Sequence, residues 1–127
     1  MMISLIPSAL SLALLAASAG NSSVPAAHNT CRATLTVSDA RTLATETPNA
    51  RAFVENLKAT LKTEIAGRDG TSVRVRVINT ANKNELVGVY SVNLRTGAVL
   101  DDDQEPAEDE QTATVRQRLI GRHCNAR

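Results

Sequence analysis

The sequence predicts an α+β domain: an antiparallel sheet of three to four strands, with one long helix on one face and a second helix at the C-terminus. Three patterns support this prediction. One segment has helical apolar spacing, one alternates strictly between apolar and polar residues, and two apolar runs are joined by a turn sequence. The 127 residues include one Phe, one Tyr and no Trp, so Val, Leu, Ile and Ala must fill the core.

The long helix is predicted at Pro48–Ala66. Thr47 suits the N-cap, Pro48 suits the first helical position, and Gly67 suits the C-terminal cap. The apolar stripe of this segment consists of Phe53, Val54, Leu57, Leu61 and Ile65. Such a stripe is typical of an amphipathic helix that buries one face against a sheet. Before this helix, alternation of apolar residues with Thr predicts a short strand at Ala33–Val37.

A strand with two different faces is predicted at Ser72–Val77, because apolar and charged residues alternate there without a break. Its valines, which must point into the core, are Val73, Val75 and Val77. Arg74 and Arg76 then point to the opposite face of the sheet.

A hairpin is predicted after a turn-rich loop. Its first strand is Leu86–Leu94, where the apolar pattern changes phase at Gly88, and a glycine at a phase change indicates a β-bulge. The turn Arg95–Gly97 leads to a last short strand, Ala98–Leu100.

Charge is unevenly distributed along the chain. Residues 101–110 hold seven carboxylates, whereas the remaining residues together have a net charge of +8. We expect a solvated acidic turn and then a helix that begins near Pro106 and ends before Gly121. One alternative is a weak calcium loop, since Asp101, Asp103 and Glu105 alternate, but Pro106 stands where EF-hand loops require glycine.

The N-terminus has the pattern of an export signal. No charged side chain precedes Arg32, residues 3–17 form an apolar run, and Ala17-Ser18-Ala19 is a small-x-small cleavage site. We therefore predict a signal peptide at residues 1–19, a flexible lead-in at 20–32 and a single domain at 33–127. The expected location is secreted or periplasmic, with no membrane attachment after cleavage.

Cys31 and Cys124 are the only cysteines, and in an exported chain two cysteines near the two ends most often form one disulfide. The alternative is a metal site that adds His28 and His123, because Cys and His together are ligands for soft metals. We expect the disulfide, with no metal and no cofactor.

The sequence has none of the catalytic motifs that would indicate an enzyme. A Gly-x-Ser-x-Gly elbow, a His-Glu-x-x-His helix and a phosphate-binding glycine loop are all absent from it. Nucleic acid is also an unfavourable partner, because the formal net charge is +1 and aromatic side chains for base stacking are few.

The stretch Val89–Val99, with its alternating strand, Thr-Gly turn and following aliphatic residue, resembles PepSY-type domains. These are small extracytoplasmic modules in which a helix precedes a hairpin, and the resemblance extends over residues 48–100. It implies inhibition or regulation of an extracytoplasmic peptidase, and it implies no catalytic residues.

The sequence as a whole thus favours an exported, non-enzymatic binding module for a protein partner, with a peptidase as one candidate. Arg74 and Arg76 are the predicted partner-binding residues, because interface cores are enriched in Arg. Two alternatives stay open: a small metal-binding protein that uses the Cys and His residues near the termini, and a small hydrolase with an unrecognised site.

Overall fold

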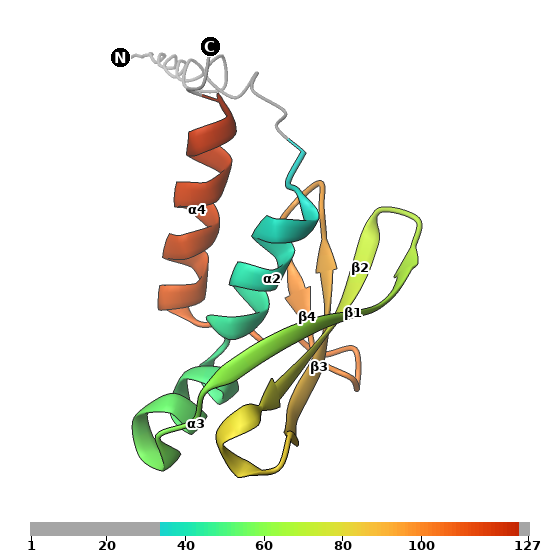
Figure 1. The fold of residues 1–127 in the computed structure, drawn as a ribbon. Helices are drawn as coiled ribbons and strands as arrows, with labels where there is room; N and C mark the ends of the chain where they lie inside the picture. The colour runs from blue at the N-terminus through green and yellow to red at the C-terminus, as the bar shows by residue number, and fades with distance from the viewer. Residues whose placement is uncertain (1–33, 125–127) are drawn as a thin grey trace, which may run out of the picture. The chain divides into compact units, whose positions relative to one another are not determined.

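A computed structural model describes residues 34–124 (Figure 1). In chain order the elements are α2 (Val37–Thr45), α3 (Pro48–Leu57), β1 (Leu61–Asp69), β2 (Ser72–Asn79), the 3-10 turn η4 (Thr80–Asn82), β3 (Glu85–Asn93), β4 (Val99–Leu100) and α4 (Glu110–Cys124). The four strands form one antiparallel sheet in the order β1-β2-β3-β4. This confirms the α+β class, the antiparallel sheet and the C-terminal helix.

One continuous core joins the helices to one face of the sheet. Side chains from α2, α3 and α4 pack together with the inward side chains of β2 and β3, and α2 and α4 stand side by side on that face (Figure 1). The most deeply buried large apolar side chains are Leu35, Leu43, Val73, Val75, Val77, Val92, Val99 and Leu119. The α-helices of residues 34–124 therefore lie on one face of the sheet.

The predicted long helix at Pro48–Ala66 is wrong in its second half. Helix α3 ends at Leu57, because Lys58 turns into the left-handed region with φ 56°, and its N–H bonds back to the Phe53 carbonyl. Leu61–Asp69 is strand β1, paired with β2 along its length. Leu57, expected in the core, is 60% exposed.

The predicted strand at Ala33–Val37 is also wrong, and Ala33 itself lies outside the described residues. Val37 is the first residue of α2, and Thr36 is its N-cap in a capping box with Asp39. The segment still makes one kind of contact that a strand would make: Leu35 N–H donates a hydrogen bond to the Leu94 carbonyl at 2.8 Å. The segment is a helix start held against the sheet.

The central strand behaves as the alternation predicts. Val73, Val75 and Val77 are fully buried, whereas Arg74 and Arg76 are exposed. The predicted bulge is also present, because Val77 pairs with Gly88 while Ile78 pairs with Leu86. Val87 is the extra residue, next to the glycine at which the pattern changes phase.

Helix α4 begins and ends four residues later than predicted. Pro106 and Ala107 instead extend along the outer edge of β4, with a bridge from Leu100 to Pro106 and a bond from Ala107 N–H to the Val99 carbonyl. At the other end the helix continues through Gly121 to Cys124. Among the helices of the described residues, none has the length and apolar character that a membrane span requires.

Candidate functional site

The face of the sheet turned away from the helices is open, and both predicted partner-binding residues lie on it. Arg74 pairs across the sheet with Ser91, and Arg76 pairs with Glu64 on one side and Val89 on the other. Directly opposed residues in a sheet share one face, so these side chains form one surface. We call it the open face and define it by Lys62, Glu64, Arg74, Arg76, Leu86, Val89 and Ser91. Ile78, which pairs with Lys62 and Leu86 on this face, is 5% exposed, so the face is open around Arg74 and Arg76 and closed at that end.

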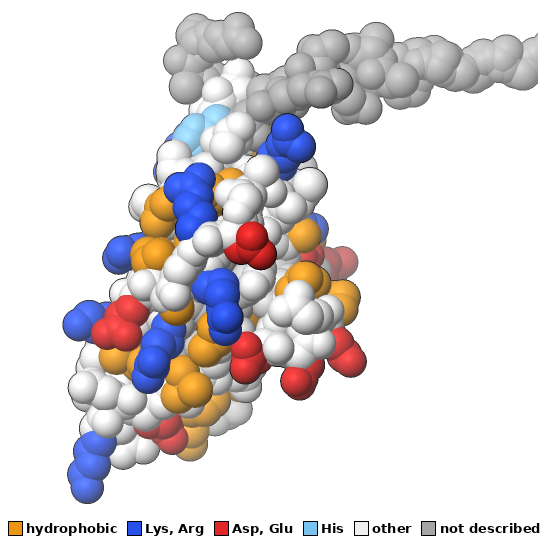
Figure 2. Space-filling view, turned by 90° about the vertical axis from the view of Figure 1, so that its right-hand side faces the viewer, with side chains coloured by type: hydrophobic (Ala, Val, Ile, Leu, Met, Phe, Trp, Pro, Cys, Tyr) orange, Lys and Arg blue, Asp and Glu red, His pale blue; other side chains and the backbone are white. Residues whose placement is uncertain are grey.

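The open face combines cations with exposed aliphatic groups. Figure 2, which looks at the right-hand side of Figure 1, shows Lys and Arg side chains interspersed with hydrophobic ones and acidic side chains along the flank. Leu86 is 51% exposed, which is a large fraction for a leucine in a strand. Of these side chains, Arg is the type that is enriched at protein-binding interfaces.

Both arginines hold only weak ion pairs within the chain. Arg74 contacts Asp102 at 3.3 Å and Arg76 contacts Glu64 at 3.8 Å, and all four side chains are between 46% and 71% exposed. Exposed pairs of this kind contribute about 0–1 kcal/mol each. The two guanidinium groups can therefore exchange these partners for carboxylates of another molecule at little cost.

The acidic run divides into a solvated turn and two structural anchors. In the turn, one carboxylate oxygen of Asp101 accepts hydrogen bonds from the N–H groups of Asp103 and Glu105. The anchors are Glu108, which accepts from Val99 N–H and pairs with Arg116, and Asp109. No group of three acidic, His or Cys side chains in residues 34–124 is arranged to hold a metal ion.

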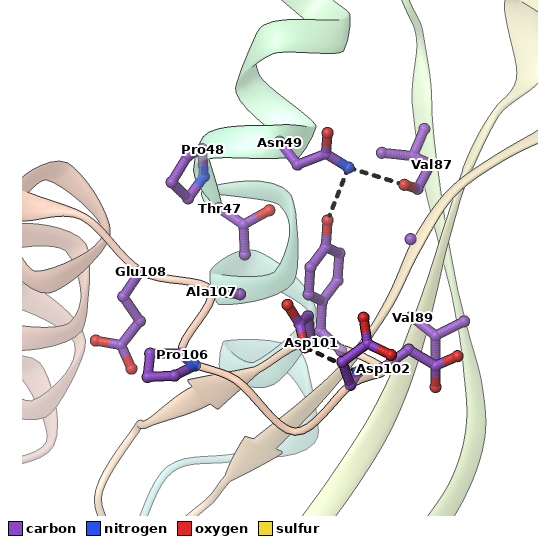
Figure 3. Close-up of a pocket in the computed structure, with 13 residues that line it drawn as sticks. Thr47, Pro48, Asn49, Val87, Val89, Asp101, Asp102, Pro106, Ala107 and Glu108 are labelled. Carbon is purple, nitrogen blue, oxygen red and sulfur yellow. Dashed lines mark hydrogen bonds between the residues drawn. The ribbon is translucent and has the colours of Figure 1, made fainter.

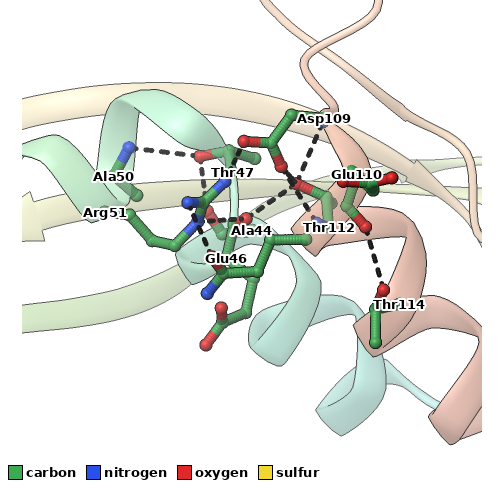
Figure 4. A network of polar contacts seen from close by, with 10 residues as sticks. Ala44, Glu46, Thr47, Ala50, Arg51, Asp109, Glu110, Thr112 and Thr114 are labelled. Atoms are coloured by element: carbon green, nitrogen blue, oxygen red, sulfur yellow. Dashed lines mark hydrogen bonds and ion pairs between the residues drawn. The ribbon is translucent and has the colours of Figure 1, made fainter.

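Asp109 links α4 to α3 (Figure 4). It caps α4 by accepting from Thr112 N–H at 3.0 Å, and it pairs with Arg51 of α3. The buried hydroxyl of Thr112 also contacts the Glu46 carbonyl at 2.8 Å, which fixes the helix start against the end of α2. The backbone N–H of Thr112 and the Arg51 guanidinium lower the pKa of Asp109 to about 2. The sequence places Asp109 in the first turns of the predicted C-terminal helix, but gives no sign of its contact with Arg51.

The depressed pKa of Asp109 predicts an acid-dependent loss of stability. Its ordinary value is 3.8, so folding favours the ionised form, and the contribution is complete above about pH 5 and is lost as the pH falls toward 2. Between pH 5 and pH 2 we expect Asp109→Asn to lose less of its unfolding free energy than the wild type does. Urea titrations at several pH values measure this, with Asp103→Asn as control. Parallel pH profiles for Asp109→Asn and the wild type would contradict the assignment.

The predicted disulfide and the metal alternative each join residues inside the described range, Cys124 and His123, to residues before it. Cys31 and His28 lie outside residues 34–124, so the Cys31–Cys124 disulfide stays a prediction. His123 contacts Asp39 through its Nε2 at 2.7 Å, and Asp39 is almost fully buried. Burial alone would raise the pKa of Asp39, but hydrogen bonds from Thr36 and His123 outweigh it and hold that pKa below its usual range. His123 thus ties the end of α4 to the start of α2.

A cavity of about 370 Å³ opens beside strand β3 (Figure 3). Its walls are the start of α3, the segment Val87–Tyr90 of β3 and the loop that follows β4. Asn49 donates from Nδ2 to the Val87 carbonyl at 2.9 Å and contacts the Tyr90 hydroxyl at 3.3 Å. The Tyr90 ring lies over Gly88, where an added Cβ would come within 2.6 Å of the hydroxyl oxygen. Sequence reasoning missed this cavity, because its walls are far apart along the chain.

Comparison with known proteins identifies no relative of this chain: no family model, no curated protein and no solved structure matches it. The resemblance to PepSY-type domains therefore rests on the residues of the Val89–Val99 hairpin alone.

Proposed function

We propose that this chain is an exported, non-enzymatic binding module that recognises a protein partner through the open face of its sheet. The observation that supports the proposal best is the placement of all three described helices on the other face, which leaves the middle of β2 uncovered. Two arginines that are each about half exposed lie at the centre of this face, and Arg is enriched among the residues that dominate binding energy at interfaces.

The chemistry of the face indicates what kind of partner fits. Arg presents a planar fork of donors that matches carboxylate groups, and aliphatic neighbours such as Leu86 and Val89 supply apolar contact around it. The partner surface is therefore acidic at its centre with apolar residues around it. The PepSY resemblance makes an extracytoplasmic peptidase the first partner to test.

The experiment that tests the proposal is affinity capture with the purified domain from the native secreted or periplasmic fraction, followed by a binding titration with each purified candidate. We expect one saturable protein partner whose binding weakens as salt concentration rises, because exposed charge pairs are screened. Absence of any saturable protein partner would overturn the proposal. Stoichiometric metal in the purified protein would favour the metal-binding alternative instead.

A further inference from the structure

Strand β3 has an unpaired edge inside the cavity. Strand β4 pairs only with Ser91 and Val92 of β3, although β3 begins at Glu85. The ladder stops because the chain leaves it at Asp101 and turns back through Glu105, so that the place where β4 would continue is occupied by the cavity. Residues Glu85–Tyr90, six of the nine in β3, therefore have no neighbour strand on that side within residues 34–124.

Alternation of the backbone identifies the groups that face the cavity. Asn93 N–H bonds to the Ala98 carbonyl on the β4 side, so the backbone groups of every second residue before it, Ser91 and Val89, point the same way. The Val87 carbonyl points to the same side of β3, since it accepts a hydrogen bond from Asn49, which also lines the cavity. Val89 N–H and C=O thus lie on the open edge between Asn49 at one end and β4 at the other.

The rim of the cavity is acidic. Among residues 34–124 its lining includes Asp101, Asp102, Asp103 and Glu108 and no Lys or Arg, and its larger apolar side chains are those of Val87, Val89 and Tyr90. Glu108 and Asp102 are each paired with an arginine, but within residues 34–124 neither Asp101 nor Asp103 has a basic side chain within ion-pair distance. The uncompensated charge at the rim is therefore negative.

We propose that this cavity binds a short extended peptide segment with basic side chains, which adds to the free edge of β3 as a further strand. Strand addition supplies main-chain hydrogen bonds to Val89, the apolar lining takes one side chain, and the aspartates take Lys or Arg. The cavity is near the small end of the range for ligand sites, which suits a segment of a few residues. The site adjoins the open face, since Val89 belongs to both and Asp102 at the rim pairs with Arg74, but it uses the edge of β3 rather than the exposed arginines.

Tyr90 provides a built-in reporter for the test. It lines the cavity and is the only Tyr in a chain without Trp, so its fluorescence reports occupancy without a label. The probe is a blocked hexapeptide of alternating Lys and Val, and its counterpart replaces each Lys with Glu. We expect saturable binding of the Lys peptide and none of the Glu peptide. Equal response to both peptides, or to neither, would overturn the proposal.

Two further measurements distinguish strand addition from simple charge attraction. In amide exchange followed by NMR, the Lys peptide should slow the Val89 N–H by at least about tenfold and leave Tyr90 N–H, which belongs to the β2 ladder, unchanged. Asp103→Lys should weaken binding about two- to fivefold, as expected for one exposed charge pair, whereas Glu55→Lys on the exposed end of α3 should not. An unprotected Val89 amide at saturation would overturn strand addition.

The variant Arg76→Glu separates this proposal from the function proposed for the open face. It should weaken capture of the protein partner and leave binding of the Lys peptide unchanged, because Arg76 does not line the cavity. If Arg76→Glu abolished peptide binding as well, the cavity would not be a separate site.

Discussion

Replacing Arg74 and Arg76 together by Glu should weaken partner capture by at least about thirtyfold, which corresponds to about 2 kcal/mol and to the loss of a binding hot spot. The two side chains are the cations at the centre of the open face, and reversal of both charges places carboxylates opposite an acidic partner. Like charges in contact across an interface are strongly unfavourable. Titration of the purified partner against both proteins measures the effect.

The same double substitution should leave the fold unchanged. Both side chains are about half exposed, and each forms only a weak exposed ion pair. Thermal unfolding of the variant is therefore the control, and Arg41→Glu with Arg118→Glu, which reverses two exposed charges on α2 and α4, is the matched comparison. Unchanged capture by a folded Arg74→Glu, Arg76→Glu protein would show that the open face is not the binding surface.

The second large effect concerns the contact between α4 and the rest of the domain. Leu119 is 2% exposed and belongs to the core that joins α4 to the sheet and α2. Leu119→Ala should reduce the unfolding free energy by about 2–5 kcal/mol, through lost apolar contact and a remaining cavity. Urea denaturation measures this directly.

Leu57 provides a control with identical chemistry. It is 60% exposed near the end of α3, so Leu57→Ala should change stability by no more than about 0.5 kcal/mol. The sequence stripe predicts the opposite, because it places Leu57 on the buried face of a long helix. Comparable losses for the two Leu→Ala variants would contradict the structure in this region.

The pattern at Leu57, Leu61 and Ile65 explains why the long helix was predicted. Residues four apart lie on the same side of a helix and also on the same side of a strand, so this spacing does not distinguish the two. Gly67 also favoured the long helix, because glycine commonly follows the last residue of a helix. In the structure Lys58 takes the left-handed position, and φ of Gly67 is 152° in a strand next to the bulge at Ala66.

The sequence predicts correctly those elements whose spacing of apolar residues fits only one type of secondary structure. Val73, Arg74 and Val75 alternate strictly, which only a half-buried strand explains, and the open face follows from that one strand. Thr36 and Asp39 have the spacing of a capping box. This pattern could have predicted that a helix, and not a strand, begins at residue 37. The cavity beside β3 depends on where β4 ends, and a turn at Asp101 leaves no periodic signal.

Site-specific photo-cross-linking tests the central claim, that the open face is the partner-binding surface, most directly. A benzoylphenylalanine introduced at Leu86 lies on the open face, and one introduced at Leu57 lies on α3, with native exposures of 51% and 60%. With the captured partner, we predict a covalent adduct from position 86 and none from position 57. An adduct from position 57 alone would place the partner on the helical side and contradict the account.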